Sequence, residues 1–210
     1  MQKRINLLFS VFFLFNLVSC KTHRKDFEKE FYYPNSSDFS LSKNYQYIEL
    51  NGFNDFSQLV DSLENLNYDE KRAYLKIDSN KKRYNVLVST TFGKCYPVFI
   101  KLKNILSISK DSLRKEKNYP IKNLKSILKK DFSNFGKDYD YSDSPEKLII
   151  SLTCEIDELE NLIIKVSEAF NEIQQESSDS LKLNIFVNRR IEVLPPPPIF
   201  KDLERFIDNN

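Results

Sequence analysis

Residues 148–187 read LIISLTCEIDELENLIIKVSEAFNEIQQESSDSLKLNIFV, two apolar runs separated by a long amphipathic pattern. The first run, 148–154, is apolar on both faces for several positions, which is typical of a central strand. Apolar residues in 157–175 recur at helical spacing, and 181–187 have the character of a second strand. We expect these helical positions to face inward: Leu159, Leu162, Ile163, Val166, Ala169, Phe170 and Ile173.

A second helix is expected upstream, between Pro120 and Gly136. Proline near the start of a helix and glycine just past its end are the positions where each is best tolerated. Lysines occupy the other faces of this helix and indicate a solvated surface or, alternatively, a contact with an anionic partner. The lysines are Lys122, Lys125, Lys129 and Lys130, and the apolar stripe consists of Ile121, Leu124, Ile127, Leu128, Phe132 and Phe135.

In the first half of the chain, the hydrophobic period switches between the values typical of strands and of helices. Residues 45–50 suit a strand, and the apolar residues of 56–66 have helical spacing, with Asn54 or Asp55 as the N-cap. Three further strands are expected at 73–78, 83–90 and 96–102, with a turn at 79–82. This order of elements predicts an α+β fold, a mixed β-sheet with helices packed mainly on one face.

The N-terminus has the pattern of an export signal. Lys3 and Arg4 precede an apolar run over 5–15, and Leu17-Val18-Ser19-Cys20 follows it. The run is shorter than the ~20 apolar residues that a membrane-spanning helix needs. The last four residues resemble the lipobox of bacterial lipoproteins, which predicts cleavage after residue 19 and acyl chains such as palmitate on Cys20. The alternative is an uncleaved anchor with an incidental cysteine.

Cleavage at this point leaves a chain with balanced charge. The whole chain has a formal net charge of +2, and residues 1–19 contain two cations and no acid, so 2 − 2 leaves zero. A neutral chain has no electrostatic excess of the kind that nucleic-acid binding requires. We therefore expect no nucleic-acid partner and a membrane contact through the lipid.

Two further cysteines, Cys95 and Cys154, fall in strand-like runs of an exported chain, where disulfides are permitted. They are candidates for a bridge or, alternatively, two buried free thiols. The one histidine is His23, and neither CxxC nor HxxxH spacing occurs in the sequence. We therefore expect no metal site and no cofactor.

The chain divides into four parts. Residues 1–19 are the signal peptide, 20–42 a polar tether, 43–194 the globular domain and 195–210 a proline-rich tail. Four consecutive prolines at the start of the tail favour extended polyproline II geometry. The apolar residues beyond them either dock into a groove of a partner or fold back on the domain itself.

Several stretches of the second half carry a family resemblance. Residues 119–131, 134–138, 143–152 and 168–173 read YPIKNLKSILKKD, NFGKD, DSPEKLIISL and EAFNEI. They resemble the periplasmic domain of the ExbD/TolR family of biopolymer-transport proteins, in the form found in Bacteroidetes-type bacteria. The ExbD-like part would cover about 73–187.

The resemblance implies a soluble fold that pairs with a second copy as a homodimer and contacts energy-transducing transport subunits. Family members normally carry protons on an aspartate in their membrane helix, where an ionisable group is costly and therefore functional. Here residues 5–19 contain no Asp or Glu, and Asn16, the candidate polar replacement, cannot titrate. The chain is thus not expected to be the proton-coupled subunit, and no functional residue of the family transfers to it.

These patterns favour a lipid-anchored envelope protein, on the periplasmic face or the outer-membrane surface, that is a non-enzymatic accessory or binding module for envelope transport. The alternative is a surface-exposed lipoprotein that binds a nutrient or adheres. An enzyme is disfavoured and no catalytic residue is assigned, because three glycines leave no phosphate-binding loop and His23 lies in the tether. Acids at 155–160 fall where a helix begins, and there they favourably meet its dipole.

Overall fold

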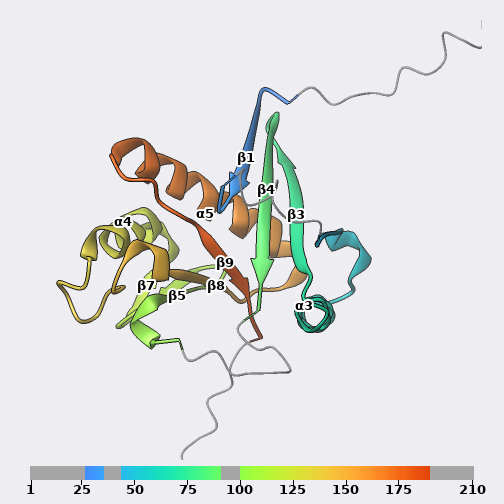
Figure 1. The fold of residues 1–210 in the computed structure, drawn as a ribbon, viewed down its shortest axis with the longest axis horizontal. Helices are drawn as coiled ribbons and strands as arrows, with labels where there is room; N and C mark the ends of the chain where they lie inside the picture. The colour runs from blue at the N-terminus through green and yellow to red at the C-terminus, as the bar shows by residue number, and fades with distance from the viewer. Residues whose placement is uncertain (1–26, 36–43, 91–99, 190–210) are drawn as a thin grey trace, which may run out of the picture.

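The computed structural model describes residues 27–35, 44–90 and 100–189. These ranges form one mixed sheet with three α-helices and four short 3-10 helices (Figure 1). The strands are β1 (Lys29–Tyr33), β2 (Tyr45–Ile48), β3 (Arg72–Ser79), β4 (Lys82–Ser89), β5 (Ile105–Ile108), β6 (Ser112–Arg114), β7 (Asn118–Pro120), β8 (Ile149–Leu152) and β9 (Asn184–Val187). The helices are α3 (Phe56–Tyr68), α4 (Leu124–Asn134), α5 (Ile156–Glu176), η1 (Leu50–Gly52), η2 (Leu102–Asn104), η3 (Ile121–Asn123) and η4 (Pro145–Lys147). The predicted α+β class is confirmed.

The strands lie in the order β2-β3-β4-β9-β8-β5-β6-β7, and β1 pairs with β4 beside this path. β8 is interior, as its two-sided apolar pattern predicts. β2, α3 and β3 form one parallel crossover unit, and β8, α5 and β9 form a second that runs antiparallel to the first. In the strand order, the step from β2 to β3 and the step from β8 to β9 also go in opposite directions across the sheet. Crossovers of the normal right hand therefore place α3 and α5 on the same face.

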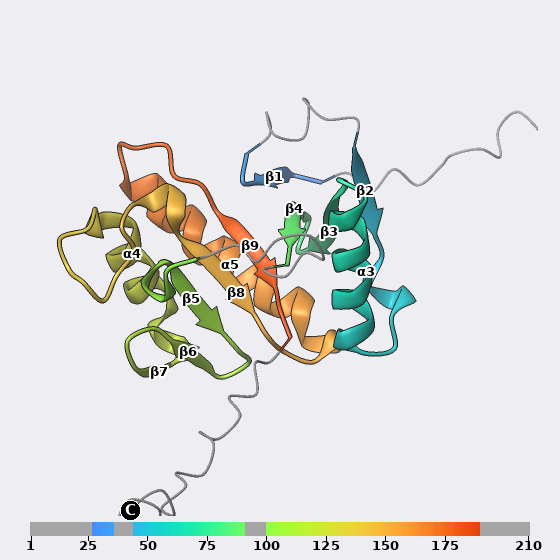
Figure 2. The same cartoon turned by 60° about the horizontal axis from the view of Figure 1, so that its bottom comes forward.

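Burial along the strands shows which face the helices cover. In β3, Ala73, Leu75 and Ile77 are at most 2% exposed, whereas Lys76 and Asp78 point the other way and are exposed. α3 packs against β3 and β4, α5 against β3, and α4 against α5 (Figure 2). Within the described ranges the three α-helices all lie on this face, and no helix is both long and apolar enough to cross a bilayer.

The first strand corrects the predicted domain boundary. The sequence predicts a tether over 20–42, but residues 29–33 form β1, which pairs in parallel with β4. Tyr33 is 2% exposed, and its hydroxyl donates a hydrogen bond to Asn171 Oδ1 at 2.9 Å. Its ring meets that of Phe170 edge to face at 5.8 Å. The tether prediction is wrong here because charged residues around β1 mask the alternation of its inward-facing aromatic side chains.

β1 and β9 share one side of β4. β3 occupies the other side along nearly the whole strand, so β1 pairs with 82–86 and β9 with 88–89 on the same side, end to end. β4 therefore joins the first and the last strands of the described chain within one sheet.

The ends of two helices show one confirmed prediction and one correction. Asp55 caps α3, since its side chain accepts a hydrogen bond from the Gln58 N–H at 2.9 Å. α4 ends at Asn134, and Phe135 has a left-handed backbone with φ 46° and a side chain that is 54% exposed. The placement of Phe135 in the buried stripe is therefore wrong. The chain turns there, because Gly136 follows with φ 75° and ends the helix as expected.

The predicted strand over 96–102 is wrong in the part that the structure describes. Residues 96–99 lie outside the described ranges, and the last three residues of the prediction contain no strand. The strand is instead β5, where Leu106 and Ile108 are at most 1% exposed. Its pattern was hidden because Asn104, a polar residue that is 6% exposed, breaks the apolar run just before it.

Lysines of α4 pair with acids of α5. Lys125 Nζ lies 2.8 Å from Glu172 and 3.0 Å from Glu176, and Lys129 Nζ lies 2.6 Å from Glu176. The two ammonium groups lower the pKa of Glu176 to about 2. Exposed pairs of this kind contribute little to stability. These ion pairs agree with the predicted solvated lysine face of α4, which lies along α5.

Candidate functional site

Of the site residues singled out in the sequence, Cys154 lies in the described part of the chain. Cys20 and Cys95 lie outside it, so lipidation and the Cys95–Cys154 bridge stay predictions. Cys154 follows β8, is half-buried and has no disulfide partner among the described residues. Burial raises the pKa of this thiol to about 12, and the charge of Glu158 adds to the shift. So small a thiolate fraction at neutral pH makes Cys154 a poor nucleophile.

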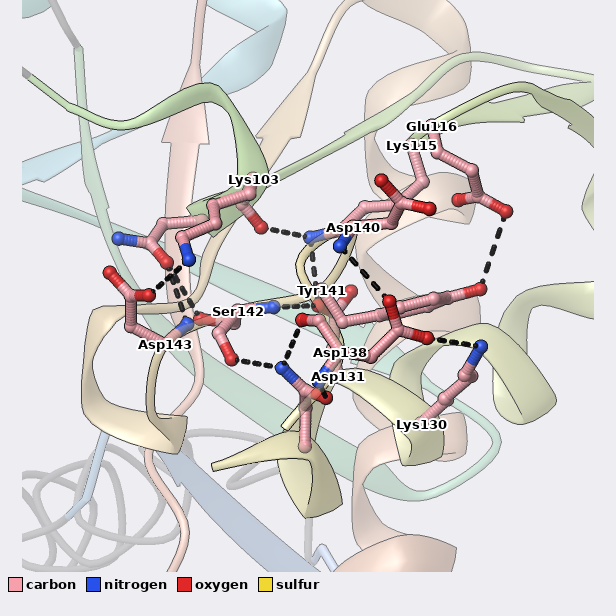
Figure 3. Close-up of polar contacts among 12 residues, drawn as sticks. Lys103, Lys115, Glu116, Lys130, Asp131, Asp138, Asp140, Tyr141, Ser142 and Asp143 are labelled. Carbon is pink, nitrogen blue, oxygen red and sulfur yellow. Dashed lines mark hydrogen bonds and ion pairs between the residues drawn. The ribbon is translucent and has the colours of Figure 1, made fainter. Parts of the chain in front are cut away.

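The structure brings together a different group of residues, drawn in Figure 3. At its centre lies an ion pair with 2.7 Å between Lys115 Nζ and Asp131 Oδ1, and both side chains are at most 1% exposed. Lys115 follows β6, and Asp131 lies on the inward side of α4. Lys115 Nζ also donates to the Lys103 carbonyl at 2.6 Å, and the Ser142 N–H donates to Asp131 Oδ1 at 2.8 Å. The pair thus ties four separate segments together.

Two buried asparagines fasten the loop that follows α4. Asn134 Nδ2 donates to the carbonyls of Asp138 and Ser142 at 2.9 and 2.8 Å, and Asn134 Oδ1 accepts from the Asp138 N–H at 2.8 Å. Asn104 Oδ1 accepts from the Ser142 hydroxyl at 3.2 Å and from the Asp143 N–H at 2.9 Å. These bonds satisfy backbone groups that an irregular segment would otherwise leave unpaired. The loop is therefore held in one shape from inside.

Burial opposes both charges of the central pair. It lowers the pKa of Lys115 and raises the pKa of Asp131, and the partner's charge offsets only part of each shift. The stability that Asp131 contributes is lost as the pH rises through its folded pKa, and that of Lys115 is lost as the pH falls through its own. Near neutral pH the charged pair therefore costs stability, which the bonds from Ser142 and to Lys103 offset. Asp131 Oδ2 has no partner within the described ranges.

An open cleft of about 530 Å³ lies beside the ion pair. Leu102 and Tyr139 stand at its rim and are 86% and 83% exposed. Lys103 Nζ lies 5.1 Å from the centre of the Tyr139 ring, a cation–π distance. Asp143 binds Lys103 at 2.5 Å and Lys101 at 3.1 Å, and these ammonium groups lower its pKa to about 2. The cleft thus offers a stacking surface, an apolar contact and charges in fixed positions.

Sequence reasoning missed this site, although one part of it was visible. Asp131 follows Ile127 and Leu128 by four and three residues, so it falls on the apolar stripe of its helix. A carboxylate there needs a buried partner. Lys115 offered no comparable pattern, because it follows a three-residue strand in a polar segment. Its pairing with Asp131 depends on how β6 and α4 pack together.

No family model, no curated protein and no solved structure matches this chain. In the described ranges, no group of three His, Cys, Asp or Glu residues is placed to hold a metal ion. The fold and the site describe the kind of protein this is. It is an α+β domain with helices over one face of a mixed sheet and an internally fastened loop beside an open cleft.

Proposed function

We propose that this chain is a lipid-anchored bacterial envelope protein whose ExbD-like domain is a non-enzymatic accessory or binding module for envelope transport. The observation that carries the binding role is the cleft, where exposed Leu102 and Tyr139 stand beside a loop that buried polar groups hold in place. A surface fixed in this way loses little conformational entropy when a partner binds. Its mixture of aromatic, apolar and charged groups suits a protein segment as the partner.

The anchor rests on the N-terminal pattern that ends in Cys20. Acyl chains contribute about 0.8 kcal/mol for each buried CH₂, so several chains on one cysteine hold a protein on a membrane without a spanning helix. Residues 5–19 contain no acid that could carry a proton. What the chain brings to a transport assembly is therefore its folded domain.

The ExbD-like assignment is supported by where the resembling segments lie. They fall on α4, the loop after it, β8 and α5. Asp131 and Asn134 bond α4 to that loop, and α4 packs against α5. The resemblance thus covers one connected part of the fold. It is the basis for proposing that the domain pairs with a second copy and contacts transport subunits.

The mass of the native protein tests the anchor. We expect protein purified from membranes to begin at Cys20 and to carry acyl chains, because the lipobox directs both modifications. A Cys20→Ala variant should keep residues 1–19 and lose the lipid mass. Intact-mass spectrometry of both proteins is the measurement. A native protein that still has residues 1–19 and an unmodified sulfur would remove the basis of the proposal.

Photo-crosslinking from the cleft tests the partner. A photoreactive amino acid in place of Leu102 or Tyr139 should form adducts with membrane transport subunits several-fold more often than the same probe at Tyr68. Tyr68 is a matched control, since it is 57% exposed and lies at the end of α3. Equal adducts at the three positions would argue against the cleft. Removal of the domain by protease added to intact cells would instead favour the nutrient-binding or adhesive alternative.

A further inference from the structure

The chain enters the domain at the tip of one hairpin. The Glu28 N–H donates to the Lys81 carbonyl at 2.9 Å, and Lys29 pairs with Lys82 as β1 begins. Lys81 belongs to the turn between β3 and β4, where Asn80 and Lys81 have φ values of 47° and 60°. Figure 1 shows the start of β1 at the same end of the sheet as this turn. Whatever holds the N-terminus therefore acts on the tip of the β3–β4 hairpin.

The connection between Cys20 and this entry point is short. Glu28 is eight residues beyond Cys20, and an extended chain spans at most about 3.6 Å per residue, so the reach is about 29 Å. β4 alone, with eight residues, is about 26 Å long. Glu70 marks the opposite end of the sheet, because it precedes β3, which runs from Arg72 toward the hairpin. The Glu70 end can therefore lie farther from Cys20 than the hairpin tip, by up to the length of a strand.

We propose that the tip of the β3–β4 hairpin, residues 79–82, faces the phospholipid headgroups of the membrane that holds Cys20. This inference rests on the lipid anchor of the proposed function and assigns the surface that the anchor turns toward the bilayer. The opposite end, at Glu70, faces away from it. β1 is the reason, because its pairing with β4 places the hairpin tip directly at the end of the short connection and Glu70 a strand length beyond it.

Charge at the hairpin tip is balanced. Lys81 Nζ lies 2.7 Å from Glu28, Lys82 Nζ lies 3.3 Å from Glu168, and Arg83 is paired with an acid of β3. The tip therefore has no excess charge for anionic lipids, which a basic surface would attract. The reach of the chain sets the orientation, and salt should leave it unchanged.

Energy transfer to labelled lipid tests the orientation. Full-length lipidated protein with Cys95→Ser and Cys154→Ser receives a donor dye at Asn80→Cys or at Glu70→Cys, in phosphatidylcholine vesicles with acceptor dye on a fraction of the headgroups. Both positions are exposed turn residues with positive φ, 47° and 56°, so they are matched in backbone strain. We expect at least twofold more efficient transfer from position 80 than from position 70, at low and at high salt. Equal transfer from the two positions, or a difference that salt abolishes, overturns the inference.

A lengthened connection supplies the second arm. Thirty Gly/Ser residues inserted between Lys25 and Asp26 form a flexible coil with a root-mean-square length of about 30 Å and a far longer reach. The difference between the two labels should then shrink to within error, and a difference that persists would contradict the role of the short connection. Intact mass of the same samples separates the two proposals. An unmodified Cys20 contradicts the proposed lipid anchor. A lipidated protein with equal transfer from both labels contradicts the proposed orientation alone.

Discussion

Replacing Asp131 with alanine is expected to lower the free energy of unfolding by about 3–5 kcal/mol, because the charge of buried Lys115 is then left without a counter-charge. The Ser142 N–H also loses its acceptor, so the loop after α4 loses one of its fastenings. Urea denaturation followed by circular dichroism measures the change, and tyrosine fluorescence gives a second probe in a chain without tryptophan.

The matched control removes both charges of the pair. Lys115→Met with Asp131→Leu fills the same space with apolar groups, and buried pairs replaced in this way are often neutral or stabilising. We expect the double variant to regain most of the stability that Asp131→Ala loses. A loss below about 1 kcal/mol for Asp131→Ala would show that the pair is not buried as described.

Replacing Tyr33 with alanine should lower the free energy of unfolding by about 3–5 kcal/mol, the usual cost of removing a buried aromatic side chain. The ring is 2% exposed, packs against Phe170, and its hydroxyl reaches Asn171. A residue of a loose tether would show no such effect. The same denaturation measurement therefore tests whether β1 belongs to the domain.

Tyr32 is the neighbouring control. It lies on the other side of β1, and its hydroxyl donates to Glu30 in an exposed position at 2.8 Å. Tyr32→Ala should cost less than about 1 kcal/mol, as surface substitutions usually do. Tyr33→Phe should cost about 1 kcal/mol through the lost hydrogen bond. Equal and small effects of Tyr32→Ala and Tyr33→Ala would show that residues 29–33 belong to the tether and not to the folded domain.

Long elements with one clear period were predictable from the sequence. The apolar stripes at 56–66 and 157–175 correspond to α3 and α5 within two residues at each end, because several turns of a helix repeat the same signal. β1 and β5 were missed because each has only four or five residues and each is flanked by polar side chains. In such short strands the alternation is real, but the flanking charges outweigh it.

The site was harder to predict than the fold for a physical reason. Asp131 was readable as an acid on an apolar stripe, yet nothing local indicated that its partner is Lys115, which lies sixteen residues earlier, on the other side of β7 in the sequence. The cleft depends on Leu102 and Tyr139, which the fold places at one rim, although Tyr139 belongs to no periodic pattern and Leu102 was assigned to a strand that does not form there. Exposure of a large side chain is a property of the packed molecule, so it emerges only after the elements are assembled.

The end-to-end arrangement of β1 and β9 along β4 has a mechanical meaning. The N-terminal end of β1 leaves at the hairpin, and the C-terminal end of β9 leaves at the far end of β4, with both strands parallel to β4. Tension between the two ends of the domain would pull these strands lengthwise in opposite directions. The hydrogen bonds that β4 makes with β1 and with β9 would then be loaded together, in shear, instead of opening one after another. A domain built in this way is suited to bear a pull between its two ends without coming apart.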